Sequence, residues 1–242
     1  MSAAPILQVD GLSKSFRGLR AISEVSFAIE AGSITSIIGP NGAGKSTLFN
    51  LITGYLAPTA GDVRFRDRRI TGMATNRIAE LGVARAFQIA RPFRDLSVFE
   101  NVRIGALFGK AGSRDVEATT RRGMELAAIA HLADQPANTL TVGQLRHLEV
   151  ARAIATRADL LLADEPCAGL NPTETAAMIE VLRRIRASGV TIVLVEHDMP
   201  SVMEVSDRLL VLDAGAMIAD GPPHEVAGDP RVIAAYLGSP DD

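Results

Sequence analysis

A glycine-rich segment that ends in lysine, serine and threonine constrains this chain more than any other feature. Residues 39–47 read Gly-Pro-Asn-Gly-Ala-Gly-Lys-Ser-Thr and fit the phosphate-binding pattern Gly-x-x-x-x-Gly-Lys-[Ser/Thr]. Residues 33–38 before it are mostly β-branched and apolar, which predicts a buried strand, and residues 48–52 after it predict a helix. The motif therefore lies where a strand leads into a helix, and in that context the pattern indicates a nucleotide site.

The residue types of this segment explain how it can bind phosphate. Its glycines let backbone N–H groups converge on one anion, and the N-terminus of the following helix adds a partial positive charge. Lys45 can place its ammonium between the β- and γ-phosphates, and Ser46 can bind a bridging Mg²⁺ ion through its hydroxyl. A glycine-rich turn whose lysine only reaches solvent is the alternative. The candidate phosphate-binding residues are Gly39, Pro40, Asn41, Gly42, Ala43, Gly44, Lys45, Ser46 and Thr47.

Composition and charge limit the classes of partner and compartment. The 242 residues carry a net charge of -3 and only 4% aromatic residues, unlike proteins that bind nucleic acid through a basic face or by base stacking. No apolar run is long enough to span a bilayer, and the first residues do not resemble a signal peptide. The single cysteine, Cys167, fits a reducing compartment. We therefore expect a cytosolic protein without nucleic acid as a main partner.

Strands alternate with helices along much of the chain. Residues 6–9 and 25–29 predict an antiparallel pair of strands joined by a polar loop that carries Phe16. Further strands are predicted at residues 62–65, 83–87, 160–163 and 190–195, and helices at residues 74–81, 144–156 and 172–187. Residues 97–130 have helical spacing and predict a mainly helical insert. This order predicts an α/β fold with a mainly parallel sheet.

Polar side chains follow three of the predicted strands. Asp164 and Glu165 end the strand that begins at residue 160, so Asp164 can reach the Mg²⁺ shell while Glu165 points at the γ-phosphate as a general base or water-positioning residue. His197 follows the strand at residues 190–195 and is the candidate γ-phosphate sensor, because parallel strands end at one edge of a sheet. Gln88 follows the strand at residues 83–87, where its amide can bind the metal or the attacking water.

Each of these residues also has a structural interpretation without a ligand. Asp164 and Glu165 can simply be the polar residues at which a buried strand reaches solvent. A lone histidine such as His197 usually has a structural role. Glutamine is common at a strand exit. The phosphate loop in the same chain is the observation that favours the catalytic interpretation of Asp164 and Glu165.

The order of the motifs resembles the ATP-binding subunit of an ABC transporter over nearly the whole chain. The resemblance rests on residues 39–47, Gln88, Leu140-Thr-Val-Gly-Gln144, residues 160–165 and His197. It implies an ABC-type P-loop NTPase with a RecA-like, mainly parallel sheet, an N-terminal antiparallel β region and a helical subdomain. It also implies one domain over residues 1–242, whose core is residues 1–87 and 151–242 and whose helical subdomain is residues 88–150.

The resemblance implies a role for each matching residue. Phe16 would stack on the adenine of ATP, and Gln88 would be the lid glutamine that faces the membrane partner. Glu165 would be the catalytic glutamate and His197 the switch histidine. The signature segment would be residues 141–144, which would contact ATP held by a second subunit through Thr141, Gly143 and Gln144.

Shorter segments resemble the importer group for branched-chain amino acids. They are Gly82-Val-Ala-Arg-Ala-Phe-Gln88 with Arg91-Pro-Phe, Leu96-Ser-Val-Phe-Glu-Asn-Val102, Ala168-Gly-Leu-Asn-Pro172 and Val232-Ile-Ala-Ala-Tyr-Leu-Gly238. That group also imports other amino acids, urea and amides, so these substrates stay open. Two residues depart from the broad pattern: Val142 replaces a glycine of the usual signature, which makes a positive φ costly there, and Asn171 stands where many ABC proteins have aspartate.

The resemblance also implies partners and a location. Two ATP-binding subunits, identical or homologous, would meet head to tail and act on membrane-spanning permease subunits, with a substrate-binding protein as an indirect partner. The chain would lie at the cytoplasmic face of the cell membrane, and the surface near residues 88–96 would receive a short permease helix. The rival functions are a non-transport ABC ATPase, a nucleotide-gated interaction module and a small GTPase, whose Asn-Lys-x-Asp motif is absent from the sequence.

Overall fold

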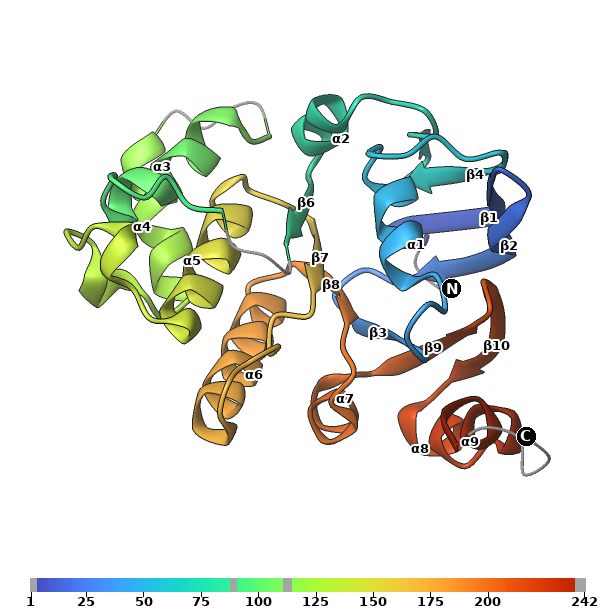
Figure 1. Cartoon of the computed structure of the whole chain (residues 1–242). Coiled ribbons are helices and arrows are strands. Elements are labelled where there is room, and N and C mark those ends of the chain that lie inside the picture. Colours follow the sequence, from blue (N-terminus) through green and yellow to red (C-terminus); the bar gives the residue numbers. More distant parts are fainter. Residues whose placement is uncertain (1–3, 88–90, 111–114, 238–242) are drawn as a thin grey trace. The chain divides into compact units, whose positions relative to one another are not determined.

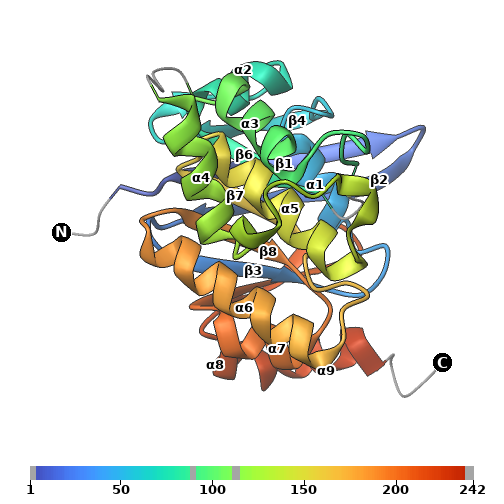
Figure 2. The ribbon, with the colours of Figure 1, turned by 90° about the vertical axis from the view of Figure 1, so that its left-hand side faces the viewer.

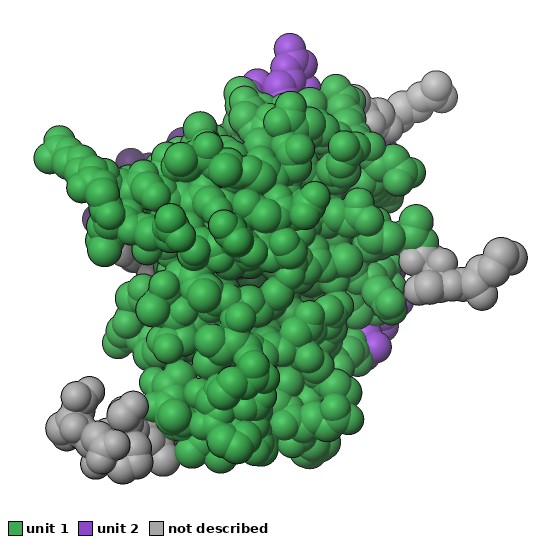
Figure 3. Space-filling view, turned by 90° about the vertical axis from the view of Figure 1, so that its right-hand side faces the viewer, with its two compact units in different colours: residues 1–75, 193–242 green, residues 76–192 purple. Residues whose placement is uncertain are grey.

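The computed structural model describes residues 4–87, 91–110 and 115–237 (Figure 1). The chain divides into two compact units: residues 1–75 with 193–242 form unit 1, and residues 76–192 form unit 2. Strand β8 (Thr191–Val195) crosses the boundary in the chain, because its first two residues belong to unit 2 and its last three to unit 1. Figure 3 shows one face of unit 1 in green.

Unit 1 contains a four-stranded antiparallel sheet in the order β2-β1-β4-β5. Its strands are β1 (Leu7–Phe16), β2 (Leu19–Ile29), β4 (Ala60–Phe65) and β5 (Arg68–Arg69). The predicted antiparallel pair is confirmed, but the predicted polar loop around Phe16 is wrong. Phe16 is the last residue of β1 and pairs with Leu19, because Leu12 and Ile22 are fully buried and continue the core side of both strands. Only Arg17 and Gly18 form the turn.

A second sheet of unit 1 carries the phosphate loop. Strand β3 (Ile34–Ile38) is buried along its whole length and pairs in parallel with β9 (Arg208–Asp213), which pairs antiparallel with β10 (Ala216–Gly221). The end of β8 lies on the other side of β3. The short helices α7 (Met199–Val205), α8 (Pro223–Ala227) and α9 (Pro230–Leu237) add Val202, Val226 and Val232 to the core around Ile38.

Unit 2 begins with helix α2 (Thr75–Leu81), whose first residue belongs to unit 1, and contains the two parallel strands β6 and β7. Strand β6 (Val83–Ala86) pairs with β7 (Leu160–Asp164), with Val83 opposite Leu160. The start of β8 lies beside β7, where the Thr191 N–H donates to the Asp159 carbonyl at 2.9 Å. The predicted strand at residues 83–87 therefore ends one residue early, and the predicted parallel pairing is confirmed.

The mainly helical insert predicted at residues 97–130 is confirmed in unit 2 by the first two of the following helices. Helices α3 (Val98–Phe108), α4 (Val116–Leu126) and α5 (Val142–Ala155) lie side by side in Figures 1 and 2. Two glycines allow this close packing, since a Cβ on Gly105 would overlap the Arg152 carbonyl, and one on Gly123 would lie 3.1 Å from the Ala151 carbonyl. The insert therefore attaches to α5 by backbone-to-backbone contact.

Helix α6 (Pro172–Ala187) has the predicted bounds. Asn171 accepts a hydrogen bond from the Glu174 N–H, and the Glu174 carboxylate accepts one from the Asn171 N–H, which completes a capping box before Pro172. In the part of the chain that the structure describes, neither α6 nor any other helix is long and apolar enough to cross a membrane.

Candidate nucleotide site

Two glycines of the phosphate loop are required by close contacts of the backbone. Gly39 has a φ of 149°, and a Cβ there would overlap the carbonyl oxygen of Leu212 in β9. Gly44 has a φ of 103°, and a Cβ there would lie 2.7 Å from the carbonyl oxygen of Ala21 in β2. The loop therefore fits between strands of unit 1 only with hydrogen at these positions.

Lys45 lies inside the loop at the start of helix α1 (Lys45–Ile52). Its side chain is buried, and Nζ donates to the carbonyl oxygens of Gly39 at 2.5 Å and Pro40 at 2.9 Å. Gly44 caps the helix without a side-chain hydrogen bond, so the first N–H groups of α1 are not satisfied by a capping side chain of the described residues. The ammonium and the helix N-terminus thus concentrate positive potential at the loop.

Two further segments of unit 1 support the phosphate loop, and neither contact was predicted from the sequence. The Gly215 N–H, in the turn between β9 and β10, donates to the Ala43 carbonyl at 3.1 Å. Tyr236 of α9 hydrogen-bonds the backbone of Gly39. Burial raises the pKa of Tyr236 above its ordinary value of 10.0, and this hydrogen bond opposes the rise. Helix α9 therefore contacts the phosphate loop, although the two are far apart in the sequence.

His197 lies in unit 1 just after β8, on a segment fixed by its two acidic neighbours. Its side chain is 62% exposed, and Nδ1 lies 3.8 Å from Oε2 of the fully buried Glu196. Oε2 of Glu196 also accepts a hydrogen bond from the His197 N–H at 3.3 Å. On the other side, Asp198 caps α7 by accepting from the Ser201 N–H at 3.0 Å. The imidazole is thus presented to solvent while its backbone is held.

Phe16 presents an exposed ring at the end of β1 in unit 1. It is 41% exposed, and Nζ of Lys14 lies 5.1 Å from the ring centroid. A cation over an aromatic face is attracted by the ring quadrupole. The arrangement is compatible with the predicted stacking on a base.

Asp164 and Glu165 have different environments in unit 2. Asp164 ends β7 with a buried side chain, and Oδ2 accepts from Nη2 of Arg85 in β6 at 2.5 Å. Glu165 follows with a φ of 49°, a left-handed conformation that is uncommon outside glycine. Strained backbone of this kind is frequent at functional sites. The chain therefore turns sharply at the predicted catalytic glutamate.

Arg85 is a residue of the site that sequence reasoning missed. It stands in the otherwise apolar strand β6, where its guanidinium carbon lies 4.8 Å from the ring centroid of Phe87. The signal in the sequence was a single charged residue within the otherwise apolar run Val83-Ala-Arg-Ala86. A charge in a buried strand needs a partner, so this residue indicates that a counter-charge lies nearby. That partner is the carboxylate of Asp164.

The signature segment forms the capped start of α5. Oγ1 of Thr141 accepts from the Gln144 N–H at 3.3 Å, and Oε1 of Gln144 accepts from the Thr141 N–H at 2.9 Å. Val142 is the first helical residue and is 58% exposed, so the expected cost of a positive φ does not arise. Gly143 is buried, and a Cβ there would lie 2.7 Å from Oε1 of Glu174.

The residues predicted to hold Mg²⁺ have suitable chemistry. Ser46 is exposed in the first turn of α1, and Asp164 ends β7, so they offer a hydroxyl and a carboxylate oxygen. Mg²⁺ prefers oxygen ligands and commonly takes one or two from the protein and others from phosphates. Among the described residues, His, Cys, Asp and Glu do not gather in groups of three or more that could hold a metal. Gln88 lies outside the described residues.

Residues 22–168 match the model of a family described as ABC transporter, which is more than half of the chain. This chain belongs to the ABC transporter family. Residues 216–242 of this ABC protein also match a shorter model described as branched-chain amino acid ATP-binding cassette transporter. The second match includes β10, α8 and α9, and so includes Tyr236 beside the phosphate loop.

Curated relatives of this ABC protein match it over nearly their full length. It is 40% identical to the high-affinity branched-chain amino acid transport ATP-binding protein BraF of Pseudomonas aeruginosa, over 97% of this chain and 98% of that protein. It is 41% identical to the corresponding protein LivG of Salmonella typhimurium, with the same coverage. A third relative, LivG of Escherichia coli, is 39% identical over 97% of this chain and 98% of that protein.

Solved structures confirm the ABC-type fold. A nucleotide-free ATP-binding cassette from an ABC transporter has a TM-score of 0.89 and 30% identity, over 97% of this chain and 100% of that chain. An ATP-binding cassette of an ABC transporter in its ADP conformation has a TM-score of 0.88 and 31% identity, over 98% of this chain and 100% of that chain. The α/β fold predicted from the order of the motifs is therefore confirmed.

Proposed function

We propose that this chain is the ATP-hydrolysing subunit that energises an importer for branched-chain amino acids. The observation that carries the proposal is its agreement, over nearly the full length, with relatives named as ATP-binding proteins of high-affinity branched-chain amino acid transport. The match of residues 216–242 to a branched-chain cassette model supports the same substrate class. We retain residues 1–242 as one functional domain, with the core and helical subdomain predicted from the sequence.

The phosphate loop and Lys45 bind the phosphates of ATP in this proposal. Phosphate oxygens replace the carbonyl oxygens of Gly39 and Pro40 as acceptors for Nζ, which places the ammonium at the β- and γ-phosphates. Ser46 and Asp164 would hold Mg²⁺, together with Gln88. The ion supplies positive charge that stabilises the phosphates. Phe16 stacks on the adenine.

Hydrolysis depends on the polar residues that follow β7 and β8. The Glu165 carboxylate accepts a proton from the attacking water, and the strained turn presents it beyond the end of the strand. His197 donates a hydrogen bond to the γ-phosphate, which its exposure after β8 permits. Both residues stay in the roles that the sequence predicted for them.

A second ATP-binding subunit, identical or homologous, completes the site. The signature segment is the surface that meets it, because Thr141 and Val142 are exposed at the start of α5. The Thr141 oxygen accepts within the capping box, and its hydroxyl proton remains able to reach a phosphate oxygen of the partner's ATP. Gly143 and Gln144 add backbone and amide groups at the helix N-terminus.

A cavity in unit 2 is the proposed contact with the permease. It has a volume of about 560 Å³ and is lined by Arg91, Pro92, Arg94, Ala137, Asn138, Leu140 and Leu145. A short permease helix with acidic side chains fits this lining, since Arg91 and Arg94 are both exposed and cationic. The cavity reaches Leu140, next to the signature segment, and docking there would place the chain at the cytoplasmic face of the membrane.

Reconstitution of the assembled transporter tests this function. The chain is copurified with its membrane subunits, placed in proteoliposomes with the associated binding protein, and assayed for ATP hydrolysis and for uptake of labelled leucine, urea and amides. We expect leucine to be taken up only when ATP is enclosed within the proteoliposomes. Lys45→Ala should abolish this uptake. Uptake of urea or an amide without leucine would overturn the substrate class, and absence of membrane partners would overturn the transport function.

A further inference from the structure

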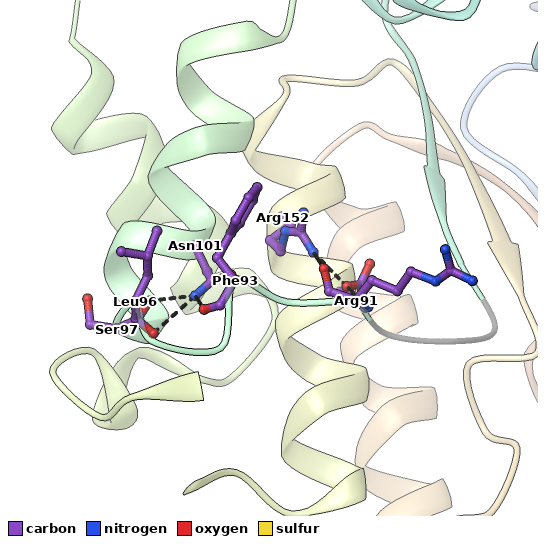
Figure 4. Close-up of polar contacts among 7 residues, drawn as sticks. Arg91, Phe93, Leu96, Ser97, Asn101 and Arg152 are labelled. Atoms are coloured by element: carbon purple, nitrogen blue, oxygen red, sulfur yellow. Dashed lines mark hydrogen bonds and ion pairs between the residues drawn. The ribbon is translucent and has the colours of Figure 1, made fainter. Parts of the chain in front are cut away.

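The loop at residues 91–97 is held from α3 by one buried amide (Figure 4). The side chain of Asn101 is fully buried, and its Oδ1 accepts from the Phe93 N–H at 2.9 Å. Its Nδ2 donates to three carbonyl oxygens, those of Phe93 at 3.0 Å, Leu96 at 3.2 Å and Ser97 at 2.9 Å. One side chain therefore fixes the backbone at three positions of the loop.

The start of the same loop is held from α5 by a largely buried ion pair. Oε1 of Glu149 accepts from the Arg91 N–H at 3.2 Å and from Nη1 of Arg152 at 2.7 Å. Nη1 of Arg152 also donates to the Arg91 carbonyl at 3.1 Å, and its guanidinium carbon lies 5.7 Å from the ring centroid of Phe93. Figure 4 shows Arg152 directed at the backbone of Arg91.

These contacts hold the backbone of the loop and leave its side chains exposed. Arg91 and Arg94 are exposed, and Phe93 is 49% exposed. Desolvation of two buried charges offsets much of their mutual attraction, so a buried ion pair is by itself weak evidence of a contribution to stability. The Glu149 side chain is only 8% exposed, and it uses its buried carboxylate to bind both the Arg91 N–H of the loop and the Arg152 guanidinium. We therefore attribute the Glu149–Arg152 pair to holding the backbone of the loop in place.

Helix α5 connects this clamp to the signature segment. Glu149 lies seven residues after Val142, which is roughly two turns along one helix. Because hydrogen bonds within the helix keep this spacing, a displacement of the loop that moves Glu149 also moves Thr141 and Gly143. The loop and the signature segment thus share one rigid element within unit 2.

We propose that Asn101, Glu149 and Arg152 are positioning residues that couple the loop at residues 91–97 to the signature segment through α5. A partner that docks on the exposed loop then sets the placement of Thr141 and Gly143. The identification of that partner as a permease rests on the function proposed above, whereas the clamp itself rests on the contacts of the described residues.

The coupling is tested with Glu149→Met, which preserves helix propensity and side-chain length and removes the acceptor. The matched control is Glu117→Met on α4, which breaks an exposed ion pair to Arg121 without contacting the loop. We expect Glu149→Met to leave the basal ATPase of the isolated chain within about twofold, and to reduce the stimulation by membrane subunits and binding protein about fivefold or more. Stimulation equal to that of wild type would overturn the proposal. Glu117→Met should behave as wild type.

A conservative variant separates positioning from general loss of stability. Glu149→Gln retains an oxygen for the Arg91 N–H but loses the charge that binds Arg152. We expect its stimulation to lie between those of wild type and Glu149→Met, because the amide oxygen still accepts a hydrogen bond while the negative charge is lost. A lowered basal rate in parallel with the lowered stimulation would instead indicate a merely structural role and would count against the coupling.

Amide hydrogen exchange of the isolated chain tests the clamp without any partner. Exchange at the Arg91 and Phe93 N–H groups should be faster in Glu149→Met than in wild type and unchanged in Glu117→Met. Unchanged exchange at Arg91 would overturn the clamp. Absence of stimulation in the wild-type assembly would instead contradict the transport function. The two failures are therefore distinguishable.

Discussion

Arg85 and Asp164 form a buried ion pair between the adjacent strands β6 and β7. Nη2 of Arg85 lies 2.5 Å from Oδ2 of Asp164, and the two side chains are 8% and 6% exposed. The aspartate proposed to reach Mg²⁺ is therefore already fixed by a neighbouring cation. Burying either charge without the other would leave an ion that is paired neither with water nor with an opposite charge, which costs several kcal/mol of stability.

Arg85→Met should strongly destabilise the chain, because it leaves the Asp164 carboxylate buried without its cation. We expect the free energy of unfolding to fall by about 3–5 kcal/mol, measured by urea denaturation. Arg77→Met is the control, since it breaks an exposed pair with Glu80 and should cost less than about 1 kcal/mol. A similar small effect for both variants would show that the buried pair is not needed.

Glu165→Gln should keep ATP binding and slow hydrolysis. Gln has the same shape and tolerates the turn about as well, but it cannot accept a proton from water. We expect the rate of phosphate release to fall by roughly two to four powers of ten, which is about 3–5.5 kcal/mol of barrier. The comparison is Glu180→Gln on the exposed face of α6. Near-normal turnover of the purified Glu165→Gln protein would remove Glu165 from the mechanism.

Gly44→Ala should destabilise unit 1 more than Gly42→Ala, although both glycines belong to the phosphate loop. Both have a positive φ, 103° and 84°, but only a Cβ on Gly44 meets backbone, 2.7 Å from the Ala21 carbonyl. We expect a loss of about 1–2 kcal/mol for Gly42→Ala from backbone strain. The overlap at Gly44 should add about 1–3 kcal/mol. Thermal unfolding of the two variants checks this, and equal midpoints would contradict it.

Tyr236 should make the stability of unit 1 fall at alkaline pH. Burial raises its pKa above the ordinary 10.0, so the folded state holds the phenol proton more tightly than the unfolded state. The contribution of Tyr236 to the free energy of unfolding is fully present below pH 10, and it is lost as the pH rises through the pKa of the folded state. Urea denaturation between pH 9 and 11 should show a steeper loss for wild type than for Tyr236→Phe. Parallel curves would exclude this role for Tyr236.

Helix α6 shows how well a local pattern predicts structure here. Its bounds agree with the prediction, because Asn171, Pro172 and Glu174 are start signals that act within a few residues. The phosphate loop was predictable for the same reason, since the strand, glycines and helix are consecutive. The importer family was also correct, because its motifs keep their order along the chain.

The errors concern segments whose partners are far away in sequence. The polar stretch around Phe16 looked like a loop, but pairing of β1 with β2 extends both strands to a tight turn. Strands β9 and β10 were not predicted, although Leu209-Leu-Val-Leu212 has the apolar texture of a buried strand. Their importance lies in what they contact, since β9 lies beside β3 and the following turn supports the phosphate loop.

Sequence alone determined the phosphate loop, the caps of α6 and the order of motifs that identifies the family. These features depend on residues that are neighbours in the chain, so their hydrogen bonds and backbone conformations follow from local chemistry. Only the tertiary structure decided which buried polar groups meet. Arg85 pairs with Asp164 across 79 positions, and Glu149 binds the backbone of Arg91 across 58. A buried charge reveals that it needs a partner, but only the packing of strands and helices selects that partner.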